Sequence, residues 1–305
     1  MGKKKKDKYL GMSSEQVIYR VSRVSIASNA LLSALKLAAG IVGHSAAMVS
    51  DACHSASDVL GTLIVIIGAH FSGKKPDKDH PYGHERLECV ASLLLSDILA
   101  VIGVAIGYAG IRKLMHPEDI VIPTMLPLII AVVSIVTKEL LYQYTIHAAK
   151  RINSVSLKAE AWHHRSDALS SIGSFAGILG ARLGYPVLDP VASIIIAVFI
   201  LKVSVDIFRE TIDKLVDKKG PDEFEDRLTQ EILSVEGVMH IDSLQTRQFG
   251  SKMYADIEIT ADGTLPLYEA HKIASRVHRL LEESNPELKH CTVHVNPDEE
   301  LQHDW

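Results

Sequence analysis

Six apolar stretches dominate the first two thirds of the chain. They cover residues 17–40, 45–71, 88–113, 122–146, 157–182 and 188–211. A helix needs about 20 residues to cross a bilayer, so each stretch is long enough to span one. The first, second and fifth stretches carry isolated charges, which makes their hydropathy the weakest of the six. The pattern predicts a membrane α-helical bundle of six transmembrane helices.

The pattern changes after Gly220-Pro221. Residues 222–234 have the apolar spacing of a helix, and residues 254–260 alternate apolar and polar side chains as a half-buried strand does. With a strand at 239–248, a helix at 267–281 and a strand at 291–295, the order α-β-β-α-β predicts a small α+β domain of two layers. We therefore expect a basic N-terminal segment (1–16), a membrane domain (17–214), an α+β domain (215–298) and a short tail (299–305).

Charge divides the chain in the same place. Residues 220–305 contain 18 acidic and 7 basic residues, whereas the rest of the 305-residue chain has a net charge of +6. This balance argues against a nucleic-acid partner, because phosphate binding needs basic surface. The acidic part also contains six of the 15 histidines, which fits either a metal-attracting surface or a merely solubilising one. The three cysteines are far apart and predict no disulfide framework.

Basic residues predict the orientation of the six helices. If the helices alternate in direction, one side of the membrane receives nearly all the lysines and arginines outside the stretches, including Lys3–Lys6, Lys74, Lys75, Arg86, Lys150, Arg151, Lys214, Lys218 and Lys219. Positive charge marks the cytoplasmic side. We expect a multi-pass protein of the cell (inner or plasma) membrane with both termini in the cytoplasm.

The same polar spacing occurs in the second and fifth stretches. His54-x-x-x-Asp58 and His163-x-x-x-Asp167 each place an imidazole and a carboxylate one helical turn apart on one face. Ionisable groups at membrane depth are costly and are therefore taken as functional. Two such helices side by side predict a four-ligand site for a Zn²⁺-type cation, with Asp51 as a supporting group on the same stripe. A protonated imidazole cannot bind metal, so the site also suggests exchange of metal for protons.

Other charges interrupt the first and fourth stretches. We expect Lys36 to extend towards a membrane surface. Lys138 and Glu139 are sequence neighbours and do not face each other on a helix, so they are expected near the inner helix end or in contact with other helices.

Two further clusters are candidates for metal binding. Asp77, His80 and His84 lie within eight residues of the polar loop that follows the second stretch, which could equally be a turn shaped by Pro81 and Gly83. The other set is spread through the α+β domain, where a single histidine on an amphipathic helix is usually only surface: Asp242, Glu258, His271, His294 and Asp298.

The chain resembles the cation diffusion facilitators, most closely their bacterial zinc/proton antiporters. The resemblance covers nearly the whole chain. It rests on the two His-x-x-x-Asp pairs, the run from Asp79 to Glu88, Leu188-Asp-Pro190, Gln245-Thr-Arg-Gln248 and the run from Leu265 to His271.

The resemblance implies a homodimer with six helices per chain and a ferredoxin-like cytoplasmic domain. His54, Asp58, His163 and Asp167 would be the transport site, with Zn²⁺ as the transported ion. The loop site would fall on Asp77, His80 and His84, and a charge pair on Arg86 and Asp217. A binuclear site, with Zn²⁺ as a candidate structural ion, would fall on the α+β-domain set. There Asp242 and Glu258 replace histidines, Asn296 an aspartate and Asp298 a cysteine.

Other functions stay open at this level. Nitrogen and oxygen ligands also suit Fe²⁺, Mn²⁺, Co²⁺ or Cd²⁺. An intramembrane metallohydrolase would need an open coordination position, and the chain has no His-Glu-x-x-His run. A metal-sensing membrane scaffold without transport is the third alternative. We expect a secondary active transporter, not an enzyme.

Overall fold

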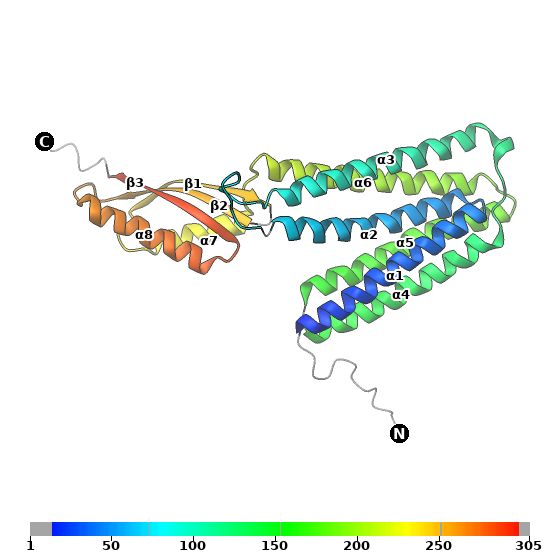
Figure 1. Ribbon diagram of the computed structural model, residues 1–305, viewed down its shortest axis with the longest axis horizontal. Helices are drawn as coiled ribbons and strands as arrows, with labels where there is room; N and C mark the ends of the chain where they lie inside the picture. The colour runs from blue at the N-terminus through cyan, green and yellow to red at the C-terminus, as the bar shows by residue number, and fades with distance from the viewer. Residues whose placement is uncertain (1–13, 73, 153, 251, 299–305) are drawn as a thin grey trace, which may run out of the picture. The chain divides into compact units, whose positions relative to one another are not determined.

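The computed structural model describes residues 14–72, 74–152, 154–250 and 252–298. The first thirteen residues of the expected N-terminal segment and the tail at 299–305 lie outside the described residues. Six long helices come first along the chain (Figure 1): α1 (Ser14–Val42), α2 (Ala46–Ser72), α3 (Leu87–Met115), α4 (Met125–Ile152), α5 (Val155–Arg182) and α6 (Leu188–Leu215). One 3₁₀ turn, η1 (Pro117–Asp119), precedes α4. Each predicted stretch therefore coincides with most of one helix.

Five of these helices are long and apolar enough to cross a membrane within the described residues, namely α1, α2, α3, α4 and α6. The helix α5 has 28 residues but falls short in hydropathy. It carries Lys158, Glu160, Arg165 and Asp167 along with its histidines. The polar side chains of α5 are what the site requires, which explains the weak hydropathy of this stretch.

The helices extend a little beyond the predicted stretches. The fourth was expected at 122–146, whereas α4 begins at Met125 and continues to Ile152. Pro127 lies in its first turn, where a missing backbone N–H costs no helical hydrogen bond. Lys150 and Arg151 lie in its last turn, where cations complement the helix dipole.

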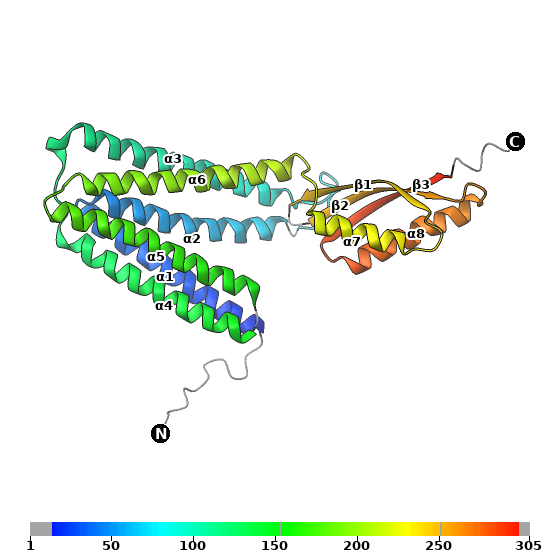
Figure 2. The ribbon, with the colours of Figure 1, turned by 180° about the vertical axis from the view of Figure 1, so that it is seen from behind.

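The chain divides into two compact units. One contains residues up to 63 together with 95–205, and the other contains 64–94 together with 206–305. The helices α1, α4 and α5 belong wholly to the first unit and lie side by side in both views (Figures 1 and 2). The helices α2, α3 and α6 contribute to both units.

Small residues bring the helices of the first unit together. A Cβ on Gly103 of α3 would lie 2.8 Å from Leu201 Cγ of α6, and one on Gly177 of α5 would lie 2.4 Å from Ala192 Cβ of α6. Only a residue without a side chain allows this approach. In both cases α6 is the partner helix.

The second unit contains the α+β domain, in the expected order: α7 (Asp222–Leu233), β1 (His240–Phe249), β2 (Lys252–Ala261), α8 (Leu267–Ser284) and β3 (Leu288–Pro297). The strands form one sheet in the order β1-β2-β3, with β1 antiparallel and β3 parallel to β2. Both helices lie on one side of the sheet (Figure 2).

Apolar stripes on the two helices form the core of this domain. Phe224, Leu228 and Ile232 of α7 are buried, as are Val277 and Leu281 of α8. They pack with the inward residues of β2 and β3 in one cluster. Burial of each such side chain stabilises the fold by about 1.5–3 kcal/mol. The apolar residues whose spacing predicted the helices are therefore the ones that stabilise the domain.

Candidate metal sites

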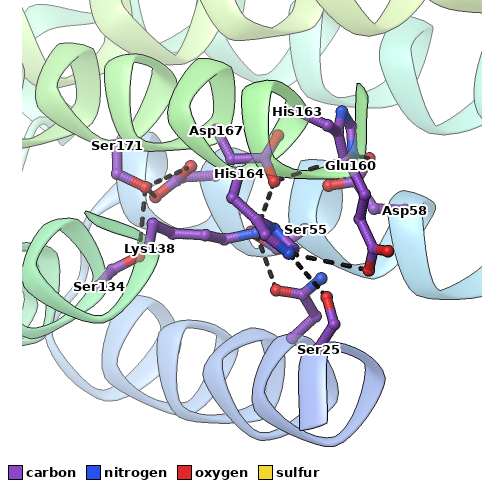
Figure 3. A network of polar contacts seen from close by, with 12 residues as sticks. Ser25, Ser55, Asp58, Ser134, Lys138, Glu160, His163, His164, Asp167 and Ser171 are labelled. Carbon is purple, nitrogen blue, oxygen red and sulfur yellow. Dashed lines mark hydrogen bonds and ion pairs between the residues drawn. The ribbon is translucent and has the colours of Figure 1, made fainter. Parts of the chain in front are cut away.

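The helices α2 and α5 bring together the four residues expected to bind a metal ion. One ligand atom from each of His54, Asp58 and Asp167 lies within 4.8 Å of the other two. The Nε2 atom of His163 lies 3.9 Å from Asp58 Oδ1 and 3.8 Å from Asp167 Oδ2 (Figure 3). The i, i+4 spacing on each helix and the packing of the two helices therefore place two imidazoles beside two carboxylates.

One atom of this cluster has the environment expected of a metal ligand. The Oδ2 atom of Asp58 is buried and has no hydrogen-bond partner among the described residues. A buried, unpartnered carboxylate oxygen costs several kcal/mol unless a cation binds it. The cluster also adjoins a pocket of about 380 Å³ between α5 and α6, lined by His54, Ser166, Ser170 and apolar residues. His163 is half-exposed, so part of the cluster is accessible.

Asp167 pairs with a lysine, which the sequence did not indicate. The ammonium of Lys138, on α4, is fully buried and donates hydrogen bonds to Asp167 Oδ2 at 2.6 Å and to Asn29 Oδ1 at 2.9 Å. Figure 3 shows Lys138 extending towards Asp167. The expectation that Lys138 contacts other helices is confirmed, and its contact is a residue of the site.

Lys36 does not reach a membrane surface, and the expectation of snorkelling was wrong. Its ammonium is buried and lies 2.9 Å from Asp51 Oδ2, where it also donates to Ser55 and Ser171. The Asp51 carboxylate accepts further hydrogen bonds from Ser171 and Ser174. A buried lysine is stable where a carboxylate and hydroxyl groups replace water. Asp51 lies one turn before His54, but the structure uses its carboxylate to neutralise Lys36.

A buried histidine, His164, follows the half-exposed His163. The ring of His164 is almost fully buried, and its Nε2 lies 2.7 Å from Ser25 Oγ of α1 and 3.9 Å from Glu160 (Figure 3). These contacts join α1 to α5 beside the metal cluster. The sequence shows His164 only as a neighbour of His163, and its direction depends on where α1 packs.

The loop residues Asp77, His80 and His84 also converge, with ligand atoms within 4.8 Å of one another. The Nε2 atom of His84 faces Asp77 Oδ2 at 3.4 Å, while its Nδ1 lies 3.3 Å from the carbonyl oxygen of Lys74. A carbonyl accepts hydrogen bonds only, so this contact fixes the proton on Nδ1 and leaves Nε2 free for a metal. The Lys74 ammonium and the backbone N–H of His80 hold the pKa of the Asp77 carboxyl well below its usual range.

The five α+β-domain residues form no comparable cluster among the described residues of one chain. Glu258 of β2 pairs in register with His294 of β3. The amide of Asn296 donates to Asp242 Oδ2 at 2.9 Å and lies 3.5 Å from Glu258 Oε2. Hydrogen bonds from Asn296 and Thr260 lower the pKa of the Asp242 carboxyl. His271 lies exposed on α8 and Asp298 follows β3.

Instead, the domain presents a cluster that the sequence reading took for ordinary surface. His278 and Glu282 of α8 and His290 of β3 have ligand atoms within 4.8 Å of one another. The i, i+4 spacing of His278 and Glu282 was a visible signal. The third member was not, because His290 is brought in by strand pairing.

Two further motifs of the resemblance make contacts in the structure, and one of these contacts was expected. Arg86 donates to Asp217 Oδ1 at 2.5 Å, as the expected charge pair, and lies over the ring of Phe249 at 4.8 Å. In the Leu188-Asp-Pro190 run, Asp189 accepts hydrogen bonds from Ser45 Oγ at 2.6 Å and from the backbone N–H of Ala46 at 2.7 Å. Asp189 thus caps the N-terminus of α2.

Known proteins match nearly the whole chain. The sequence pattern of the cation efflux transmembrane domain matches residues 22–216, and that of the cation efflux protein cytoplasmic domain matches residues 221–298. An uncharacterised transporter of Methanocaldococcus jannaschii is 34% identical over 90% of this chain and 96% of its own length. The manganese efflux system proteins MneP and MneS of Bacillus subtilis are 30% and 32% identical, over 93% and 90% of this chain and 97% and 93% of their own.

These matches agree with the apolar helices and the clustered metal ligands. The six long helices and the α+β domain have the expected architecture, and the matched proteins are transporters rather than enzymes. The chain belongs to the cation diffusion facilitator family and is a multi-pass membrane transporter for the efflux of divalent metal cations.

Proposed function

We propose that the chain exports Zn²⁺ from the cytosol in exchange for protons, and that His54, Asp58, His163 and Asp167 hold the ion in transit. The observation that carries the proposal is the meeting of two imidazoles and two carboxylates between α2 and α5. Two carboxylates balance the charge of a divalent cation, and nitrogen with oxygen ligands suits Zn²⁺.

Proton coupling follows from the same ligands. Imidazole as a group titrates near neutral pH, and only its neutral form binds metal. A site that opens to each side of the membrane in turn can therefore release metal on the side where protons enter. Export then draws on the proton gradient, as in a secondary active transporter.

Lys138 competes with the metal ion for Asp167. Its ammonium neutralises Asp167. A divalent cation bound to the same carboxylate would lie beside this ammonium, and like charges a few ångström apart repel strongly in a poorly solvated interior. Binding of the metal therefore displaces Lys138 from Asp167, and its return helps to release the metal.

Mn²⁺ is the second candidate substrate. Two of the relatives at 30% identity or more are named as manganese efflux proteins. The site contains two carboxylates, which Mn²⁺ also accepts. Fe²⁺, Co²⁺ and Cd²⁺ fit the same ligands and belong in the same test.

The proposed oligomeric state and membrane orientation rest on two observations. They are the distribution of basic residues along the chain and the match of the C-terminal part to a cation efflux cytoplasmic domain. The protein works as a homodimer in the cell membrane, with both termini in the cytoplasm. Asp77, His80 and His84 bind metal in the cytoplasmic loop. The set Asp242, Glu258, His271, His294 and Asp298 binds a structural ion only where the dimer brings further ligands to it.

Metal-resolved flux through proteoliposomes tests the proposal. Zn²⁺, Mn²⁺, Fe²⁺ and Cd²⁺ are compared in one preparation, for the wild type and for Asp58→Ala, with and without an imposed pH gradient. We expect Zn²⁺ flux that rises with the gradient and falls at least about 100-fold in Asp58→Ala, since Asp58 is one of the four proposed ligands.

Each contrary result rejects a different part of the proposal. Equal flux in the wild type and Asp58→Ala rejects the proposed site. Flux that is indifferent to the gradient rejects the antiport. Preference for Mn²⁺ makes the second candidate the substrate, and no flux in a folded, metal-binding protein favours a sensing scaffold.

A further inference from the structure

The cluster on α8 and β3 lies at the edge of the core of the α+β domain. Val277 and Leu281 on the buried stripe of α8 hold the helix against the sheet, and His278 and Glu282 lie one position further round on the same helix. The strand β3 is an edge strand of the sheet, and its buried Cys291 fixes the neighbouring His290 beside α8. Packing of the core therefore holds all three side chains in place.

The three side chains have the separations of metal ligands. Glu282 lies between the two rings, with Oε2 at 3.4 Å from His278 Nε2 and Oε1 at 2.9 Å from His290 Nδ1. Ligands of a tetrahedral Zn²⁺ at about 2.1 Å stand about 3.4 Å apart. The two ring centroids are 5.3 Å apart, so both rings face one carboxylate.

The backbone of Cys291 contacts two of the three ligands. His278 Nδ1 lies 2.9 Å from the carbonyl oxygen of Cys291, and the backbone N–H of Cys291 donates to Glu282 Oε1 at 3.3 Å. A carbonyl only accepts, so the ring carries its proton on Nδ1, and its Nε2 faces the carboxylate. Metal-bound histidines are oriented by the same kind of outer hydrogen bond.

The orientation of the His278 ring towards Glu282 favours a cation between them. In neutral His278 the Nε2 lone pair would face the Oε2 of a carboxylate, and two acceptors at 3.4 Å repel each other. A shared proton or a metal ion removes the repulsion. The Cys291 sulfur contacts the opposite nitrogen, Nδ1, at 3.7 Å and is not directed at the shared point.

We propose that His278, Glu282 and His290 form a metal site in the α+β domain that takes a borderline divalent cation of the Zn²⁺, Co²⁺ or Ni²⁺ class. Two nitrogens and one carboxylate favour these ions over Mn²⁺ or Mg²⁺. A pocket of about 400 Å³ lined by His271, His278 and Glu282 adjoins the site and has room for a water molecule as a further ligand. The site contains none of the residues assigned to transport.

Co²⁺ binding to the full-length protein in detergent tests the site. The background variant Asp58→Ala/His163→Ala/His80→Ala/His84→Ala/His271→Ala/His294→Ala removes ligands from the membrane and loop clusters and from the Asp242 set of the α+β domain. Co²⁺ alone is titrated and followed by its visible absorption, and Zn²⁺ is then added as a competitor. We expect one Co²⁺ per chain, displaced by Zn²⁺.

Single substitutions on that background locate the ion. His278→Asn keeps a donor for the Cys291 carbonyl but loses Nε2, and Glu282→Gln loses the charge. Each should weaken Co²⁺ binding at least about tenfold. His240→Asn, at the exposed start of β1, is the matched control and should leave binding unchanged.

Two results overturn the proposal. One is a folded background variant, checked by circular dichroism, that binds no Co²⁺. The other is equal affinity in His278→Asn, Glu282→Gln and His240→Asn. Because binding is measured and not flux, the outcome is independent of whether the chain transports Zn²⁺.

Discussion

At the scale of single residues, the least expected feature is that two buried lysines pair with carboxylates. Lys36 neutralises Asp51, and Lys138 neutralises Asp167. Ser171 of α5 contacts Asp51 and Lys36 of the first pair, and it also contacts Ser134 of α4. Only the Lys138 pair includes a residue of the proposed transport site. The two lysines are therefore chemically alike but are expected to differ in function.

Substitution of Lys138 by methionine should separate these roles. The variant leaves Asp167 without its cation, so a divalent ion no longer competes with an ammonium. We expect metal binding about tenfold tighter, equivalent to about 1.4 kcal/mol, and slower transport because release is no longer assisted. Zn²⁺ affinity in detergent, measured by competition with a chelating dye, and flux in proteoliposomes check the two parts.

Lys36→Met is the matched control, because it removes a buried lysine whose partner is Asp51. It should lower stability without tightening metal binding, since an unpaired buried carboxylate costs several kcal/mol. Tighter binding in both variants would mean that general charge, and not contact with Asp167, sets the affinity.

At the scale of elements, side-chain caps set where the helices begin. The N-terminal turn of α2 is held by the buried carboxylate of Asp189 from the start of α6, which accepts from Ser45 and from two backbone N–H groups. Charge and hydrogen bonds both favour a carboxylate at a helix N-terminus. Asp189 thereby fixes the start of the helix that carries His54 and Asp58.

Asp189→Asn should destabilise this junction. The amide keeps one acceptor but loses the charge, and a hydrogen bond to a charged group is worth about 1.5–3 kcal/mol. We expect a lower midpoint of thermal unfolding in detergent and reduced flux. Asp119→Asn, in the exposed turn η1, is the control and should change neither. An unchanged midpoint in Asp189→Asn would contradict the capping role.

At the scale of the whole molecule, the second unit joins the loop before α3 to the α+β domain. Lys289 of β3 pairs with Glu85 and donates to the Tyr82 carbonyl at 2.8 Å, and Arg86 contacts Asp217. A Cβ on Gly250, in the turn between β1 and β2, would lie 2.5 Å from the Glu85 carbonyl oxygen. The turn and the loop therefore pack against each other without room for a side chain.

Gly250→Ala should loosen the loop that carries Asp77, His80 and His84. The methyl group would clash with the Glu85 backbone, so we expect faster amide hydrogen exchange at residues 77–86 and weaker metal binding to the loop. Gly184→Ala is the control, because Gly184 also has a positive φ but has open space around it. Equal effects of the two substitutions would attribute the change to backbone strain alone.

Much of this architecture is local information in the chain. Runs of apolar residues determine α1 to α4 and α6, and the 3.6-residue and two-residue periods determine α7, α8 and β2. The spacing of His54 with Asp58, and of His163 with Asp167, places each pair on one helix face. Fold class, element order and the two half-sites were therefore predictable, because each depends only on residues close in sequence.

What only the tertiary structure decided depends on which elements meet. The sequence could not show that Lys138 of α4 reaches Asp167, that Lys36 turns inward to Asp51, or that Asp189 caps α2, because these partners are far apart along the chain. The cluster of His278, Glu282 and His290 needed β3 beside α8. The sequence by itself determined the candidate ligands and the helix faces on which they lie. Packing decided which groups pair with them, because a buried charge is stable only beside a partner of opposite charge.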